Sequence, residues 1–270
     1  MKTVRDKSGR LLGQVVLVTG ASSGLGEQIA YEAARQQAIV ILCARRKEKL
    51  ITIARKCQQL SGQPAFYYEL DLIDPQQVDQ MLADIRNKIS NIDILVNCAG
   101  FGLFRDFLAF DLTVAREMFE VNVLGLMHLT QKVALEMAPF GSGQIVMIAS
   151  QAGKIATMKS SVYSATKAAV ISFSNALRLE LKPLGITVMT VNPGPIKTAF
   201  FDRADETGNY LNTIDKVAIE PDKLAKKIVR SFKTKRREIN TPIAMEVANK
   251  AYILFPKIGD FLTGNVFNTK

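Results

Sequence analysis

The sequence predicts an α/β fold in which helices cover both faces of a mostly parallel, doubly wound sheet. Short apolar runs alternate strictly with longer helical stretches along the chain. The first runs are apolar throughout rather than alternately polar, which is typical of strands buried on both faces. A glycine-rich turn also stands directly between the first run and the helical stretch that follows it.

Each element is predicted from its hydrophobic periodicity and its flanking residues. Asp74 followed by Pro75, for example, marks the start of a helix as N-cap and first-turn proline. After Asn192 the pattern loosens, and we expect a substrate loop over residues 194–220, because long irregular stretches in compact domains are usually lids or binding loops. The expected strands are 14–19, 38–43, 65–70, 92–97, 144–149 and 186–191, and the expected helices are 27–37, 47–60, 75–89, 111–137, 161–181 and 221–237.

Length and composition favour one globular domain. The chain has 270 residues, of which 48% are hydrophobic and 22% charged, so it can bury a sizeable core. No repeat or linker-like stretch divides it, and we expect a single domain over residues 1–270. It contains no run typical of a transmembrane helix or a signal peptide. We therefore expect a cytoplasmic protein, without a metal site, whose three cysteines are reduced.

The positive charge is concentrated near the C-terminus. The net charge is +10, and residues 221–237 hold eight Lys or Arg and one Asp. The rest of the chain is nearly neutral, which argues against a nucleic-acid partner. This basic helix and the partly apolar tail over 244–270 could dock on an anionic membrane surface, making the protein peripheral to the membrane. A solvated charged face and a subunit interface are the common alternatives.

The glycine-rich turn predicts a dinucleotide site. Gly20, Gly24 and Gly26 have the spacing GxxxGxG between a strand and a helix. A tight turn, close approach of the backbone to a pyrophosphate, and close helix–strand packing each need a residue without a Cβ. The helix start then offers free N–H groups and its positive dipole end to the anion.

The end of the second strand favours NADP(H) over NAD(H). A carboxylate there would bond the ribose hydroxyls of NAD, whereas this chain carries Arg45 and Arg46. Guanidinium groups suit a 2′-phosphate, although two solvated arginines at a helix start are the alternative. Asp71, after the third strand, lies where it could bond the adenine ring, or it is a simple turn residue.

Tyr163 and Lys167 stand four residues apart on a predicted helix and so share one face. An ammonium beside a phenol stabilises the phenolate and lowers the pKa of a tyrosine, which lets the hydroxyl exchange a proton near neutral pH. Taken alone, such a pair is more often a surface contact, or a half-buried ring beside a solvated amine.

An ordered set of motifs from residue 14 to residue 198 resembles the short-chain dehydrogenase/reductase family. Ser150 lies thirteen residues before Tyr163. The family usually has NNAG where this chain has Cys98 as the second residue, a replacement behind the cofactor site that puts no catalytic role in doubt. The motifs are TGASSGLG (19–26), NCAG (97–100), NVLG (122–125), YSATK (163–167) and PGPIKT (193–198).

The resemblance implies a Rossmann-type, three-layer α/β/α domain of about seven strands. It also implies an oxidoreductase in which a nicotinamide supplies or accepts the hydride. Tyr163 would be the general acid in reduction and the base in oxidation, and Lys167 would tune it and bond the nicotinamide ribose. Ser150 would polarise the carbonyl, and Asn122 would support Lys167 through a water. These roles suit the chemistry, because a ketone that gains hydride needs donors at its oxygen.

The family pattern also assigns the cofactor contacts residue by residue. They would come from Gly20, Ser22, Ser23, Gly24, Leu25, Gly26, Arg45, Arg46, Asp71, Leu72, Asn97, Ala99, Gly100, Asn122, Tyr163, Lys167, Pro193, Gly194, Ile196 and Thr198.

The substrate pocket is expected to be apolar, which favours a bulky or lipid-like ketone or aldehyde, and reduction is the expected direction for an NADP-linked member. The helices over 111–137 and 161–181 resemble the pair through which the family forms dimers, so a homodimer or homotetramer is expected. The expected lining includes Phe101, Phe104, Ile155, Met158, Phe200, Phe201 and Tyr210.

Two other functions stay open from the residues alone. The fold could serve a non-catalytic nucleotide-sensing or scaffolding protein. The set of Ser150, Tyr163 and Lys167 could also serve a hydrolase with Ser150 as nucleophile. The intact glycine turn and Arg45 argue against both, since a hydrolase has no need of a dinucleotide.

Overall fold

Seven parallel strands form a single sheet in a computed structural model of the chain, which describes residues 10–89, 91–205 and 218–265. The strand order is β3-β2-β1-β4-β5-β6-β7, and every neighbouring pair is parallel. This confirms the predicted doubly wound sheet. The strands are β1 (Val15–Thr19), β2 (Ile39–Ala44), β3 (Ala65–Glu69), β4 (Ile94–Asn97), β5 (Gly143–Ile148), β6 (Ile186–Pro193) and β7 (Glu238–Thr241).

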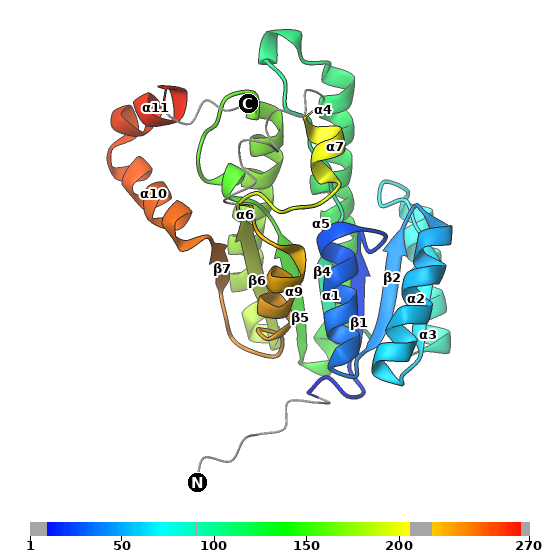
Figure 1. The fold of residues 1–270 in the computed structure, drawn as a ribbon. Helices are drawn as coiled ribbons and strands as arrows, with labels where there is room; N and C mark the ends of the chain where they lie inside the picture. The colour runs from blue at the N-terminus through cyan, green and yellow to red at the C-terminus, as the bar shows by residue number, and fades with distance from the viewer. Residues whose placement is uncertain (1–9, 90, 206–217, 266–270) are drawn as a thin grey trace.

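Helices cover both faces of the sheet, which gives three layers (Figure 1). The α-helices are α1 (Gly24–Arg35), α2 (Lys47–Ser61), α3 (Pro75–Lys88), α4 (Leu112–Phe119), α5 (Leu126–Met137), α6 (Ser161–Leu181), α7 (Phe200–Ala204), α9 (Pro221–Val229), α10 (Ile243–Leu254) and α11 (Pro256–Asn265). Shorter helical segments are η1 (Phe107–Ala109), η2 (Glu120–Gly125), η3 (Ala138–Phe140), η4 (Gln151–Gly153) and η5 (Lys182–Leu184).

Two hydrophobic cores lie on opposite faces of the sheet. Val16 and Val18 of β1 pack with α1, α2 and α9, whereas Val15 and Leu17 pack with α3, α5 and α6. Successive side chains of a strand point to opposite faces, so the continuous apolar run of β1 serves both cores. This is the physical reason why the run is not alternately polar.

The strand order reverses at β1, which pairs with β2 on one side and β4 on the other. At such a switch point the connections leave the sheet in opposite directions and open a crevice at the carboxyl ends of the strands. The glycine-rich turn follows β1 and leads into α1 at this position. The fold therefore places the predicted dinucleotide turn where doubly wound sheets bind their ligands.

Asp74 caps α3 as the sequence predicts. Its carboxylate accepts hydrogen bonds from the backbone N–H groups of Gln76 and Gln77, and Pro75 occupies the first turn. These bonds satisfy donors that a helix start otherwise leaves without partners.

The expected helix over residues 111–137 is interrupted in the structure. Helices α4 and α5 flank η2, a π-helical segment over Glu120–Gly125. A π-helical turn accommodates extra residues and is common at functional sites. Periodicity did not reveal this interruption, because apolar spacing changes little over six residues.

The expected basic helix over 221–237 is wrong in its second half. Helix α9 ends at Val229, and β7 begins at Glu238. The hydroxyl of Ser231 donates to the carbonyl of Lys227, and Lys233 adopts a left-handed φ of 58°, which a continuing helix does not allow. The sequence pattern did not predict β7, because this strand has only four residues and only Ile239 is fully buried.

The chain from residue 243 onward forms α10 and α11, which project from the edge strand β7 (Figure 1). The predicted tail thus contains two helices, and its last residues, 266–270, lie outside the described residues. Within the described ranges, no helix has the length and apolar character needed to cross a membrane.

Candidate active site

A cavity of about 520 Å³ lies at the carboxyl ends of the strands, over the point where the strand order reverses. Its walls come from the segments that follow β1, β2, β3, β4, β5 and β6, together with α6. Distant parts of the chain therefore meet in one cleft, as the switch-point topology requires.

Most residues of the predicted site line this cavity. Asn97 and Asn122 do not, because both lie behind its wall and are buried. The predicted residues that line it are Gly20, Ser22, Ser23, Gly24, Leu25, Gly26, Arg45, Arg46, Asp71, Leu72, Ala99, Gly100, Ser150, Tyr163, Lys167, Pro193, Gly194, Ile196 and Thr198.

Two glycines of the turn are required by close backbone packing. A Cβ on Gly20, which has a φ of +65°, would lie 2.8 Å from the Cα of Ala99. A Cβ on Gly26 would lie 2.5 Å from the carbonyl oxygen of Gly20. Any side chain at either position would push α1 or the turn after β4 away from the cavity.

Thr19 ties the first turn to the turn after β4. Its hydroxyl oxygen accepts hydrogen bonds from the N–H groups of Cys98 at 3.0 Å and Ala99 at 3.1 Å. The NCAG segment is thereby fixed beside the glycine turn. Asn97 lies on the other side of this wall, where its amide donates to the hydroxyl of Thr130 at 2.8 Å.

Arg46 lies against two serines of the glycine turn. Its guanidinium donates to the hydroxyl of Ser22 at 2.9 and 3.1 Å and to that of Ser23 at 2.6 Å. Arg45 lines the same end of the cavity and is exposed. Together these groups form a cationic end with hydroxyl donors, which suits a phosphate.

Ser150, Tyr163 and Lys167 line the same cavity. Tyr163 and Lys167 are one turn apart on α6, and the Lys167 Nζ atom lies 5.8 Å from the centre of the Tyr163 ring. Ser150 follows β5 and caps η4, where its hydroxyl oxygen accepts from the N–H of Ala152 at 3.1 Å. All three side chains border one space, so they can act on one reacting group.

Burial makes the charge of Lys167 costly. Its ammonium donates to the backbone carbonyl of Ile148 at 3.0 Å. Desolvation lowers the pKa of Lys167 to about 8. Burial raises the pKa of Cys98 to about 12, so this thiol stays neutral near pH 7.

Asn122 lies in the π-helical segment and holds the strand-to-loop junction behind the site. Its side-chain oxygen accepts from the N–H of Phe101 at 3.0 Å, and its amide donates to the Phe101 carbonyl at 2.8 Å. The same amide donates to Thr166 of α6 at 3.2 Å. A Cβ on Gly100 would lie 2.8 Å from the Asn122 oxygen and 3.6 Å from the Lys167 Nζ atom, which places the three residues together.

Aromatic side chains surround the hydroxyl-bearing ring of Tyr163. Its ring centre lies 5.6 Å from that of Phe200 and 5.8 Å from that of Phe104. A Cβ on Gly102 would lie 2.9 Å from both Tyr163 and Phe200, so only glycine fits between them. The expected apolar lining is thus present at Phe101, Phe104, Ile155, Phe200 and Phe201.

Two residues of the expected substrate lining have other positions. Met158 is 45% exposed and does not border the cavity, because the turn that carries it faces outward. Tyr210 lies outside the described residues, as does the expected substrate loop between 206 and 217.

Several residues that line the cavity were not predicted. Thr19 and Gln151 are adjacent to motif residues and could be found by inspecting the motif neighbours. Arg203 carries its guanidinium 3.8 Å from the centre of the Phe101 ring, and Met245 comes from α10. No local pattern marks these two, since only the folded chain brings them to the site.

Comparisons with known proteins identify the family of this chain. The family model described as short chain dehydrogenase matches residues 14–209. The dehydrogenase/reductase SDR family protein 7-like of Drosophila melanogaster is 32% identical over 237 residues, which are 85% of this chain and 73% of the relative.

Solved structures show the same fold. A short-chain dehydrogenase from Sphingobium yanoikuyae in complex with NADPH is 29% identical, with a TM-score of 0.76 over 90% of this chain and 96% of that chain. A 3-ketoacyl-(acyl-carrier-protein) reductase from Brucella melitensis complexed with NADH is 26% identical, with a TM-score of 0.76 over 86% of this chain and 97% of that chain. With the family match and the sheet topology, these similarities show that the chain belongs to the short-chain dehydrogenase/reductase family of oxidoreductases.

Proposed function

We propose that the protein is an NADP-dependent oxidoreductase that transfers hydride between a nicotinamide and a carbonyl or secondary alcohol. Reduction of an apolar ketone or aldehyde is the proposed direction. The observation that carries this proposal is that Ser150, Tyr163 and Lys167 line the same cavity as the glycine turn. A dinucleotide cofactor would use both groups, since its pyrophosphate needs the glycine turn and its nicotinamide must lie beside the proton donor.

The residues present fit the cofactor. The glycine turn packs so closely at Gly20 and Gly26 that neither position admits a Cβ, and the N-terminus of α1 lines the same cavity, where its N–H groups suit a pyrophosphate. Arg46, with Ser22 and Ser23, offers donors to a 2′-phosphate. The end of β2 carries Cys43 and Ala44 before the arginines, so it offers no carboxylate to a ribose diol. The bound cofactor would supply the hydride.

Tyr163 is the proposed proton donor to the carbonyl oxygen. A protonated Lys167 favours the phenolate that Tyr163 becomes after it has donated, which lowers the barrier to proton transfer. Ser150 would donate a second hydrogen bond to the developing oxyanion, provided that its hydroxyl hydrogen turns toward the cavity. Asn122 holds the Phe101 backbone and α6 together behind these groups.

The aromatic wall indicates the class of substrate. Phe104, Phe200 and Phe201 surround the space beside Tyr163, and their rings offer apolar contacts and exclude water. A bulky apolar carbonyl compound would bury its surface there, whereas a small hydrophilic one would leave the wall uncovered.

Thermal unfolding with each cofactor and a panel of carbonyl compounds tests this function. At about 100 times its Kd, NADPH should stabilise the protein by about 2.7 kcal/mol, and NADH at the same concentration should stabilise it much less. Loss of the nicotinamide absorbance should then follow addition of apolar ketones or aldehydes. Protection by neither cofactor would reject the oxidoreductase. Protection without turnover would favour a nucleotide sensor, and hydrolysis of an ester would favour a Ser150 nucleophile.

A further inference from the structure

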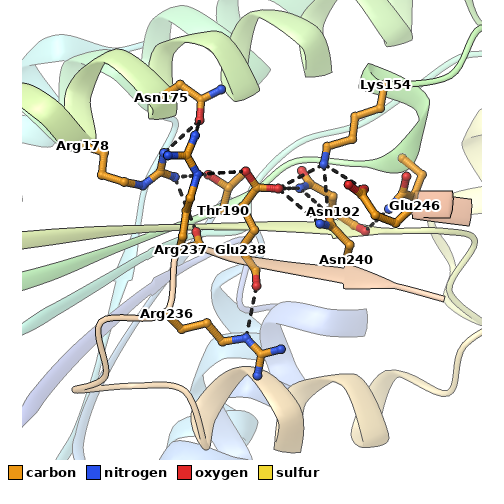
Figure 2. Close-up of polar contacts among 11 residues, drawn as sticks. Lys154, Asn175, Arg178, Thr190, Asn192, Arg236, Arg237, Glu238, Asn240 and Glu246 are labelled. Atoms are coloured by element: carbon orange, nitrogen blue, oxygen red, sulfur yellow. Dashed lines mark hydrogen bonds and ion pairs between the residues drawn. The ribbon is translucent and has the colours of Figure 1, made fainter. Parts of the chain in front are cut away.

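A partly buried ionic cluster connects the turn after β5 with β7 and α10 (Figure 2). Lys154 is its centre. The three donors of an ammonium are all used, toward Glu238 at 3.0 Å, Asn240 at 3.1 Å and Glu246 at 3.0 Å. The Lys154 side chain is only 12% exposed, so these are well-shielded contacts rather than solvated surface pairs.

The charges of the cluster are balanced. Glu238 accepts from Lys154 through one oxygen and from Arg237 through the other, at 3.4 Å. Burial of Glu238 raises its pKa, but the bonds from Lys154 and Asn240 outweigh that effect and the net pKa is lowered. The carboxylate therefore stays ionised near neutral pH, and the ion pairs persist.

The cluster joins elements that are far apart in the sequence. Lys154 directly follows η4, the turn that Ser150 caps, while Glu238 and Asn240 lie on β7 and Glu246 on α10. These partners are 84 to 92 residues away from Lys154 along the chain. Lys154 thus connects the edge strand β7 and the first turn of α10 to the turn that Ser150 caps.

A second set of bonds reaches the segment after β6. The amide of Asn192 donates to Asn240 at 2.8 Å, and the amide of Gln151 donates to the carbonyl of Asn192 at 3.0 Å. Asn192 immediately precedes Pro193 and Gly194, which line the cavity. The cluster therefore holds both segments that flank the nicotinamide end, one after β5 and one after β6.

Helix α10 packs against Gly194 at the cavity wall. The N–H of Gly194 donates to the carbonyl of Thr241 at 2.7 Å, and a Cβ on Gly194 would lie 2.8 Å from the sulfur of Met245. Met245 lines the cavity and precedes Glu246, the residue that Lys154 holds. The position of this wall thus depends on the Lys154–Glu246 contact.

We propose that Lys154 is a positioning residue, which ties β7 and α10 to the Ser150 turn and to the Pro193–Gly194 segment and so sets the nicotinamide end of the site. It touches no reacting atom. Hydride and proton transfer tolerate little displacement of the reacting groups. Loss of the Lys154 contacts should therefore slow turnover more than it weakens cofactor binding. The kinetic part rests on the proposed function, whereas the structural part does not.

Hydrogen–deuterium exchange of the full chain without cofactor tests whether the Lys154 contacts hold these segments in place. Lys154→Met keeps the aliphatic stem and removes all three donors. Exchange should rise about tenfold or more at the N–H groups of Gly153 and Gly194, which bond to Ser150 and Thr241, and stay unchanged in β1 and β2. Lys154→Arg, which keeps the charge, should restore much of the protection, and Glu246→Gln should loosen Gly194 alone.

Lys132→Met is the matched control, because Lys132 also forms an ion pair, with Asp79 at 2.8 Å, but on the outer helices. It should leave exchange at Gly153 and Gly194 as in the wild type. Wild-type protection in Lys154→Met, or a rise spread evenly over the whole sheet, would overturn the proposal. Should Lys154→Met not fold, Glu246→Gln decides: faster exchange at Gly194 with unchanged exchange in β1 and β2 supports the proposal, and wild-type exchange at Gly194 overturns it.

Kinetics separate positioning from stability alone. With NADPH and a reducible carbonyl, Lys154→Met should lose about tenfold or more in kcat while the KM for NADPH changes less than about threefold. A lower unfolding temperature with wild-type kcat would overturn the positioning role. If the wild type reduces no carbonyl, the proposed function has failed instead, and the exchange data still decide whether Lys154 holds these segments.

Discussion

Lys167 brings a positive charge into the interior at the proposed catalytic end. Its pKa of about 8 lies below its ordinary value of 10.5, because burial penalises the charged form. Between these two values the unfolded chain holds a proton that the folded chain has lost. Stability therefore rises with pH across this window, and at neutral pH the buried charge costs on the order of 3 kcal/mol.

Lys167→Met should remove this cost in the protein without cofactor. The variant should gain stability over the wild type at pH 7, and the gain should shrink toward pH 10, where the wild-type lysine is neutral. Denaturant unfolding at both pH values measures the difference. An equal difference at pH 7 and pH 10 would contradict a charge that is buried and titrates near pH 8.

Arg46 is the residue expected to select the cofactor. Losing a charge-assisted hydrogen bond to a 2′-phosphate costs roughly 1.5–3 kcal/mol, so Arg46→Ala should weaken NADPH binding by about 10- to 100-fold and leave NADH binding nearly unchanged. Fluorescence titration with both cofactors measures this. Arg45→Ala is the comparison, since no hydrogen bond holds Arg45 against the glycine turn among the described residues. An equal loss for both cofactors would argue against 2′-phosphate recognition.

At the scale of elements, the start of α1 packs on the glycine turn at a distance that excludes any side chain. Gly26→Ala would place a Cβ 2.5 Å from the Gly20 carbonyl, which is backbone and cannot step aside. We expect a loss of about 1–3 kcal/mol in stability, together with loss of NADPH protection. Thermal unfolding with and without NADPH measures both.

Gln28→Ala, on the same helix and away from the turn, is the control and should stay within about 0.5 kcal/mol of the wild type. If Gly26→Ala still binds NADPH as tightly as this control does, the close approach of α1 is not needed for the cofactor.

Elements governed by local sequence were predictable, and those governed by distant contacts were not. The turn at Gly20 and Gly26 and the pair of Tyr163 and Lys167 depend on spacings of a few residues, and the structure places them at one cavity. Asn122 in the π-helical segment bonds to Phe101 and Thr166, which lie far from it in the sequence. No spacing within the segment shows such contacts.

The same distinction explains the errors near the C-terminus. Strand β7 has one fully buried residue, Ile239, and exists because β6 offers it an open edge. Met245 lines the cavity, and Lys154 bonds to Glu246, only because the fold brings together residues that are far apart in the sequence. Continuous apolar runs predict the core strands, whereas an edge strand and its ionic contacts depend on the assembled sheet.

At the scale of the whole molecule, the outer faces of α5 and α6 carry exposed leucines. Leu135 on α5 is 66% exposed and Leu179 on α6 is 72% exposed, although the opposite faces of both helices pack in the core. We propose that these faces pair two copies of the chain, in agreement with the oligomer that the sequence predicts.

Leu179→Glu should convert the proposed dimer into a monomer, because two buried carboxylates would face each other across a two-fold interface. Light scattering of the purified protein measures the mass. Leu254→Glu, on α10 and also 72% exposed, is the control and should remain dimeric. Dissociation by the α10 variant alone would move the interface to the C-terminal helices.

In the proposed reaction, Tyr163 gives the proton that completes carbonyl reduction. The direct measurement is the rate of NADPH oxidation with an apolar ketone by the wild type and by Tyr163→Phe, each also tested for thermal protection by NADPH. We predict that the phenylalanine variant loses about 10²- to 10⁴-fold in kcat and keeps the protection. Wild-type turnover by Tyr163→Phe would contradict the account.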